Sequence, residues 1–321
     1  ELPRFNTVVR KFEMRICSLL PSATEMVFNL GLGDHLVAVT HECDYPAEAV
    51  GLPVITRSAI DNASSSSRDI HNHVSQSVHS GSSIYQLDHD LLKKLDPDII
   101  LTQELCEVCA VSYGDVESAV RLVQGDPQIV SLEPTSLGGI LESIERLGQI
   151  ADVAERAAEL VEQLRRRSDH VASVARASEA RPRVLSLEWL DPPFVGGHWV
   201  PEMVRLAGGS DGLTGEGTPS REVTWDVVTR YDPEVLVLMP CGFELERTIE
   251  ELRQAYIPDE WSRLSAVQSD KVYAVDGSAY FSRPGPRIFD GLEVLAEIIH
   301  PELFPRKSPP DAWRRVFAGG P

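Results

Sequence analysis

Hydrophobic positions in the middle of the chain follow a helical period. Between Asp152 and Arg176, apolar residues recur close to every 3.6 positions, and the segment contains neither Gly nor Pro. The recurring positions are Val153, Ala157, Leu160, Val161, Leu164, Val171 and Val174. Good helix formers occupy most of the remaining positions, and Asp152 is the expected N-cap. The pattern predicts one helix of roughly 35–40 Å between two half-chains.

Short apolar runs alternate with amphipathic segments on both sides of this helix. The runs predict strands at 15–20, 36–40, 53–56, 98–102, 128–132, 183–187, 234–239 and 271–275. The amphipathic segments predict helices at 23–30, 69–78, 88–95, 116–122, 137–150, 200–206, 224–229 and 288–299. Strands that alternate with helices are typical of parallel sheets covered by helices. We therefore predict an α/β fold.

A repeated motif indicates that this fold has two similar lobes. Leu-Asp-Pro-Asp-Ile-Ile-Leu at 95–101 matches Tyr-Asp-Pro-Glu-Val-Leu-Val at 231–237, and a short predicted helix precedes each. Ligands bind beyond the C-terminal ends of parallel strands, so two facing lobes would share one cleft. We predict Rossmann-like lobes at 14–150 and 180–300, a connecting helix at 151–179 and a Pro-rich tail at 301–321.

The amino-acid composition limits the kinds of molecule that this protein can bind. The 321 residues carry a net charge of −19, which disfavours nucleic acid and anionic membrane because both attract basic surfaces. No apolar run reaches the ~20 residues of a membrane span. Hydrophobic residues make up 42% of the chain, enough for an ordinary globular core. We expect a monomer whose partner is a small molecule.

The cysteine count leaves the compartment open. Five cysteines at irregular spacing form a poor disulfide framework, which favours a reducing compartment. Met14 precedes the first predicted strand and is one candidate start, which would favour the cytoplasm. A signal removed upstream of residue 1 would instead favour an extracytoplasmic protein.

Several thiols and one imidazole follow predicted strands and so belong near the cleft. The candidate metal ligands are His41, Cys43, Cys106, Cys109 and Cys241. Thiolate and imidazole suit zinc or another soft metal, and Cys106-x-x-Cys109 has the spacing of a zinc knuckle or a redox pair. Alternatively these are buried thiols, or Cys106 and Cys109 form a disulfide. His41 is also a candidate axial ligand for cobalt or iron.

No arrangement of catalytic residues is visible in the sequence. Ser22-x-x-Glu25 is the pattern of a helix capping box. Gly196-Gly197 before His198 lacks the spacing of a phosphate-binding loop. We therefore expect a protein that is not an enzyme and requires no cofactor.

Six segments together resemble one family. They are SLLPSATEMVFNLG at 18–31, VAVTHECDYP at 37–46, LDPDIIL at 95–101, PPF at 192–194, GG at 208–209 and FSRPGPRI at 281–288. Over about residues 15–299 the chain resembles the helical-backbone class of ABC-transporter substrate-binding proteins, and most of all its cobalamin-binding members. That class takes cobalamin, haem or iron–siderophores, so the resemblance implies a ligand held between the two lobes.

The resemblance also implies which side chains line the cleft. Aromatic positions of the cobalamin binders fall on Glu42, Arg57, Gln103 and Ser220 here, which weakens stacking on a flat corrin. Aromatic residues of the second lobe would remain. The expected ligand-binding residues are His41, Glu42, Asp44, Tyr45, Arg57, Gln103, Trp189, Phe194, His198, Ser220, Tyr280 and Phe281.

Two hypotheses of function follow. The first is a binding protein that captures cobalamin, another corrinoid or a metal chelate and, in the family's usual role, delivers it to an ABC importer. The family docks to its permease through one acid per lobe, and these positions carry Asp90 and Asp226. The second is a cytosolic metal- or corrinoid-binding protein that uses the cysteines and His41 and is not coupled to transport.

Overall fold

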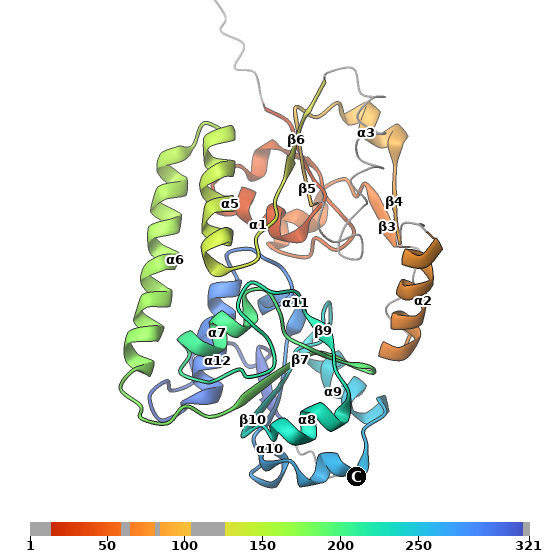
Figure 1. Ribbon diagram of the computed structural model, residues 1–321. Coiled ribbons are helices and arrows are strands. Elements are labelled where there is room, and N and C mark those ends of the chain that lie inside the picture. Colours follow the sequence, from red (N-terminus) through yellow and green to blue (C-terminus); the bar gives the residue numbers. More distant parts are fainter. Residues whose placement is uncertain (1–13, 59–64, 81–83, 104–125, 317–321) are drawn as a thin grey trace, which may run out of the picture.

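The chain forms two α/β lobes joined along one side by a long helix. A computed structural model describes residues 14–58, 65–80, 84–103 and 126–316. Figure 1 shows the N-terminal lobe above, the C-terminal lobe below and helix α6 (Ala154–Ala175) running beside both. This arrangement confirms the predicted two-lobe architecture. No helix in these four ranges combines the length and the hydropathy that a membrane span needs.

The N-terminal lobe contains a fully parallel sheet in the order β2-β1-β5-β6. Its strands are β1 (Ile16–Ser18), β2 (Leu36–Ala38), β5 (Ile99–Thr102) and β6 (Gln128–Ser131). Its helices are α1 (Pro21–Asn29), α2 (Ser67–Ser80), α3 (His89–Leu95) and α5 (Leu137–Ile150), with 3₁₀ helices at Gly33–His35 and Ala47–Gly51. The helix predicted at 116–122 lies outside the described residues.

The strand predicted at 53–56 is wrong in detail. Val54 makes only a single bridge to Val39. The next residues form a separate antiparallel pair of strands, β3 (Thr56–Ser58) and β4 (Tyr85–Leu87). Because Pro53 has no N–H to donate, the chain cannot continue a regular ladder at this point.

The C-terminal lobe has a mixed sheet in the order β12-β11-β10-β7-β8-β9. Strands β7 (Val184–Leu190), β10 (Val235–Leu238) and β11 (Val272–Val275) are parallel to one another. Strands β8 (Pro193–Val195), β9 (Arg221–Glu222) and β12 (Trp313–Arg315) join its edges antiparallel. The three central strands confirm the predicted parallel sheet, whereas the antiparallel strands at its edges were not predicted.

The helices of the C-terminal lobe lie around this sheet. They are α7 (Val200–Leu206), α8 (Trp225–Tyr231), α9 (Leu245–Gln254), α10 (Ser265–Gln268), α11 (Gly277–Tyr280) and α12 (Ile288–Ile299), with a 3₁₀ helix at Asp259–Arg263. The sequence predicts α7, α8 and α12 and misses the other helices.

The segment after residue 300, predicted as a separate tail, is part of this lobe. Strand β12 pairs with β11 and extends the sheet. Trp313 Nε1 donates to Glu297 Oε2 at 3.0 Å, and the backbone N–H of Lys307 donates to Glu297 Oε1 at 2.6 Å. One buried carboxylate on α12 therefore holds the segment against the lobe.

Helix α6 confirms the predicted connecting helix but not its cap. The buried positions Ala157, Val161, Leu164 and Val171 belong to the predicted apolar face. Val153 occupies the N-cap position, and no side chain caps the helix there. Asp152 has a φ of 57° because it closes the tight turn after α5. Its side chain therefore cannot take the capping role that the sequence suggested.

The repeated motif has matching contacts in the two lobes. The backbone N–H of Arg15 donates to Asp98 Oδ2 at 2.8 Å. The backbone N–H of Arg183 donates to Glu234 Oε2 at 3.0 Å, which is the equivalent bond. The helix before each motif also ends in an aspartate with left-handed backbone, Asp96 (φ 41°) and Asp232 (φ 48°). The lobes thus share local structure as well as element order.

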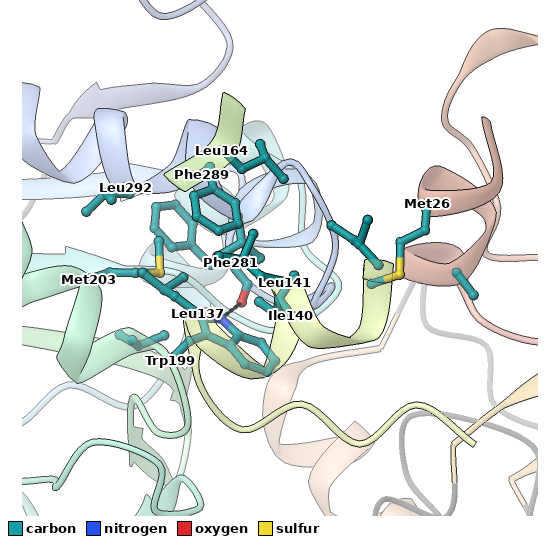
Figure 2. Packing of buried hydrophobic residues seen from close by; sticks show 14 of the residues in the cluster. Met26, Leu137, Ile140, Leu141, Leu164, Trp199, Met203, Phe281, Phe289 and Leu292 are labelled. Carbon is teal, nitrogen blue, oxygen red and sulfur yellow. Dashed lines mark hydrogen bonds between the residues drawn. The ribbon is translucent and has the colours of Figure 1, made fainter. Parts of the chain in front are cut away.

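One apolar core runs through both lobes and α6. Figure 2 shows where side chains of α5 and α6 meet the C-terminal lobe. The cluster includes Leu137, Ile140, Leu164, Trp199, Met203, Phe281, Phe289 and Leu292. Trp199 Nε1 donates to the backbone carbonyl of Phe281 at 2.9 Å, so the indole is satisfied within the core. Along the side of α6 the two lobes are therefore one packed body.

Glu188, near the end of β7, is a partly buried carboxyl group. Its Oε1 accepts a hydrogen bond from the backbone N–H of Gly197 at 3.2 Å, and the Ser220 hydroxyl also bonds to it. Burial raises the pKa of Glu188 to about 7, although the two hydrogen bonds by themselves lower it. The folded chain therefore favours the protonated carboxyl.

We predict that Glu188→Gln changes how stability depends on pH. The raised pKa means that the wild type loses stability as the pH rises from about 4.5 through about 7. The neutral amide should remove this loss, on the order of 1–3 kcal/mol. Urea unfolding followed by tryptophan fluorescence at pH 5 and pH 8 measures it. A constant difference between wild type and variant at both pH values would contradict the assignment.

Candidate functional site

The loops that follow β2 and β11 contact each other between the lobes, through Asp44 of the first and Arg283 of the second. On the N-terminal side, His41 and Glu42 follow β2. His41 Nδ1 lies 2.7 Å from Thr56 Oγ1, and His41 Nε2 lies 3.4 Å from Glu42 Oε1. The ring centroid of His41 is 5.6 Å from that of Tyr85. The hydrogen bond to His41 lowers the pKa of Glu42, so this wall is polar and carries negative charge.

Asp44 and Tyr45 lie where the N-terminal lobe faces the last loop of the C-terminal lobe. Arg283 makes a two-armed ion pair with Asp44, with Nη2 3.0 Å from Oδ2. The Arg287 guanidinium lies over the Tyr45 ring, 4.1 Å from its centroid. The Arg283 side chain is 10% exposed, whereas that of Asp44 is 58% exposed. The carboxylate is therefore the member of the pair that water reaches.

Glu25 is a functional candidate that sequence reasoning missed. Its Oε1 accepts from Arg287 Nε at 3.0 Å and from Nη2 at 2.6 Å, and its side chain is 1% exposed. The predicted capping box at Ser22 is wrong, since Leu20 is the N-cap of α1 and Pro21 begins the helix. Burial raises the pKa of Glu25, and Arg287 opposes that shift. The signal that could have identified Glu25 is its charge, since the residues around it in the helix are buried.

Trp189 and Phe194 of the C-terminal lobe, which we call the aromatic wall, contact α2. Trp189 Nε1 donates to the backbone carbonyl of Ser67 at 3.1 Å. The ring centroid of Phe194 lies 5.9 Å from that of His71. Two of the aromatic residues predicted to face a ligand therefore face a segment of the N-terminal lobe.

The other predicted polar residues have separate surroundings. His198 stacks on Trp199 with ring centroids 5.6 Å apart, and partial burial lowers its pKa. Ser220 is engaged with Glu188. Arg57 is exposed on β3, and Gln103 is half-buried after β5.

Phe281 and Tyr280, at the end of α11, have different surroundings. Phe281 is 2% exposed and belongs to the shared core. Tyr280 lines a separate cavity of about 390 Å³ between α6, α12 and the chain around Phe304. Burial in the core leaves the Phe281 ring without access to a ligand, whereas the predicted ligand contact of Tyr280 stays a prediction.

The structure describes three of the candidate metal ligands, His41, Cys43 and Cys241, and does not bring these three together. Cys43 is buried between two hydroxyls, with Sγ 3.1 Å from Thr24 Oγ1 and 3.5 Å from Thr40 Oγ1. Cys241 lies on an exposed turn of the other lobe. Within the four described ranges no group of three or more His, Cys, Asp or Glu side chains is placed to hold a metal ion. Cys106 and Cys109 lie outside the described residues.

The two candidate docking acids occupy equivalent places. Asp90 is in the first turn of α3, and Asp226 is in the first turn of α8. Both are exposed, and each lies five residues before the first residue of the repeated motif. The internal repeat thus gives each lobe one acid at the same position.

Known proteins of similar sequence are binding proteins. The chain is 25% identical to the vitamin B12-binding protein of Vibrio cholerae over 283 residues. The aligned region covers 87% of this chain and 86% of the relative. It is 22% identical over 305 residues to the ABC transporter substrate-binding lipoprotein YvrC of Bacillus subtilis, covering 93% of this chain and 84% of the relative.

Solved structures share the fold. The heme-binding protein RhuT of Roseiflexus aligns with a TM-score of 0.67 at 22% identity, covering 90% of this chain and 99% of that one. The vitamin B12-binding protein BtuF of Vibrio cholerae aligns with a TM-score of 0.65 at 23% identity, covering 91% and 98%.

The family assignment rests on these likenesses and on a family model. Residues 16–279 match the model of the periplasmic binding protein family. The fold, with its two lobes and one connecting helix, agrees with the resemblance read from the sequence motifs. The chain therefore belongs to the periplasmic binding protein family, as a helical-backbone substrate-binding protein of the ABC-transporter type.

Proposed function

We propose that this protein captures a corrinoid or another metal chelate between its lobes and delivers it to an ABC importer. Support comes from the family and from relatives whose names specify vitamin B12 or heme as ligand. The observation that carries the proposal is the facing pair of strand-end loops. Asp44 after β2 pairs with Arg283 after β11, so the two lobes bring charged groups together where a ligand would lie.

The polar wall favours a ligand that offers hydrogen-bonding groups as well as a flat face. Glu42, Arg57 and Gln103 stand on the N-terminal side where the resemblance places aromatic residues, so polar groups around a chelated metal would find partners there. The bond between Thr56 Oγ1 and His41 Nδ1 orients the imidazole. His41 would then meet a metal centre through Nε2, which now lies near Glu42.

Delivery would use the matching acids of the two lobes. Asp90 and Asp226 are exposed at equivalent positions, and each could pair with a basic side chain on a permease. Exposed ion pairs contribute little affinity individually but help to orient two partners. The two lobes would thereby dock in a defined orientation.

Closure of the lobes would depend on two ion pairs of different character. Glu25–Arg287 is buried beside the shared core, whereas Asp44–Arg283 has one exposed member. Removing one partner of a buried pair leaves an uncompensated charge. An exposed carboxylate is instead readily exchanged for water or for a ligand group.

We expect calorimetry to detect a chelate ligand. Isothermal titration with cyanocobalamin, cobinamide, haemin and a ferric hydroxamate should give a dissociation constant of about 10 µM or lower for at least one of them. Arg165→Gln, on the exposed face of α6, should bind equally well because α6 carries no ligand chemistry. Absence of binding to all four compounds would refute the proposed function.

We further predict unequal costs for breaking the two ion pairs. Arg287→Ala should lower the free energy of unfolding by about 3–5 kcal/mol, since Glu25 stays buried without its partner. Asp44→Asn should cost about 1 kcal/mol or less. Urea unfolding measures both, and Arg205→Ala, which breaks an exposed pair with Glu216, is the matched control. Equal losses for Arg287→Ala and Asp44→Asn would argue against the distinction.

A further inference from the structure

The first turn of α2 belongs to the N-terminal lobe but is held by the C-terminal lobe. In Figure 1, α2 lies on the side of the molecule away from α6 and reaches down toward the lower lobe. Ser67 is 1% exposed and Ile70 is 7% exposed. This burial on a helix with a polar sequence indicates a specific contact with the opposite lobe.

Two acids of the C-terminal lobe bind this turn. Arg68 Nε donates to Asp191 Oδ2 at 2.9 Å, and a second bond joins Arg68 Nη2 to Asp191 Oδ1. The backbone N–H of Ser67 donates to Glu251 Oε1 at 3.1 Å. The Asp191 side chain is 8% exposed and Glu251 is 2% exposed. Both acids would be hydrated if the turn moved away, so water could replace the contacts that it provides.

The same turn covers the aromatic wall of the cleft. The Ser67 carbonyl accepts the hydrogen bond of Trp189 Nε1, and His71 packs beside the Phe194 ring. A ligand that stacks on these aromatic groups would have to displace the turn or bind against it. The turn therefore occupies the position from which ligand access can be controlled.

Local contacts allow the turn to move as a unit. Ser66 Oγ donates to Asp69 Oδ2 at 2.7 Å and accepts from the backbone N–H of Asp69 at 3.2 Å, which caps the helix independently of the C-terminal lobe. The Ser67 hydroxyl is buried with no hydrogen-bond partner within the described residues. This unmet bond makes the closed contact less favourable and eases release.

We propose that residues 65–71 form a lid, anchored by Arg68 to Asp191, that closes the cleft opposite α6 and is released to admit ligand. The inference rests on the proposed function, because it regulates access to the same cleft. The lid contact is held by an ion pair and backbone hydrogen bonds with a few ring contacts beside them, whereas the contact beside α6 is a packed apolar core. Opening therefore takes place at the lid side.

Hydrogen–deuterium exchange with mass spectrometry on the full chain tests the lid. Arg68→Ala should speed exchange of the amides of residues 67–71 roughly tenfold, as expected for loss of a charge-assisted pair. Asp191→Asn should have the same effect from the opposite lobe, and Arg68→Lys should restore part of the protection. Arg205→Ala removes an Arg–carboxylate pair within one lobe and should leave residues 67–71 unchanged.

Two exchange results would overturn the proposal. One is exchange of residues 67–71 within twofold of wild type in both Arg68→Ala and Asp191→Asn. The other is equal acceleration throughout strands β1, β7 and β10, since the turn would then unfold only with the whole protein.

Association kinetics test the gating role. Stopped-flow absorbance with cyanocobalamin, or with haemin where that is the ligand bound, should show association at least threefold faster for Arg68→Ala than for wild type and Arg205→Ala. Unchanged or slower association with an opened lid would refute gating. If neither compound binds any of these proteins, the proposed function fails, and the exchange measurements alone decide whether the lid exists.

Discussion

The apolar core that both lobes share with α5, α6 and α12 constrains all other features of this protein. Side chains from the two lobes interdigitate in it, so separating the lobes along α6 would expose closely packed apolar surface. Under the proposed lid mechanism, opening would therefore take place on the side of the molecule away from α6. The helix fixes the spacing of the lobes, and the core fixes their relative orientation.

The contacts between the lobes are more easily replaced by water where they lie away from this core. Glu25 and Arg287 form a buried pair beside it. Asp44 and Arg283 form a pair with one exposed member, and the first turn of α2 makes a contact of charges and backbone hydrogen bonds. Water can substitute for polar partners but not for apolar packing. A ligand site bounded by polar contacts can therefore open without loss of the fold.

The cleft combines a common fold with an individual lining. Relatives with the names vitamin B12-binding and heme-binding protein share 22–25% identity with the chain and span most of its length. Proteins related at this level of identity keep the same packing of strands and helices, whereas their residues at the strand ends can differ. Glu42 and Arg57 stand on the N-terminal side where the resemblance places aromatic residues, and under the proposed function such polar groups would set which chelate the protein prefers.

The sequence by itself determined the features that depend on local chemistry: the helical period of α6, most of the parallel strands, and the repeat around Asp96 and Asp232. Periodicity and turn residues act over a few positions and can be read directly. Only the tertiary structure decided that Glu25 pairs with Arg287, that Tyr280 lines a cavity beside α6 and α12, and that Arg68 reaches Asp191. These outcomes join residues more than 100 positions apart or depend on how one short helix packs, and no local pattern encodes either.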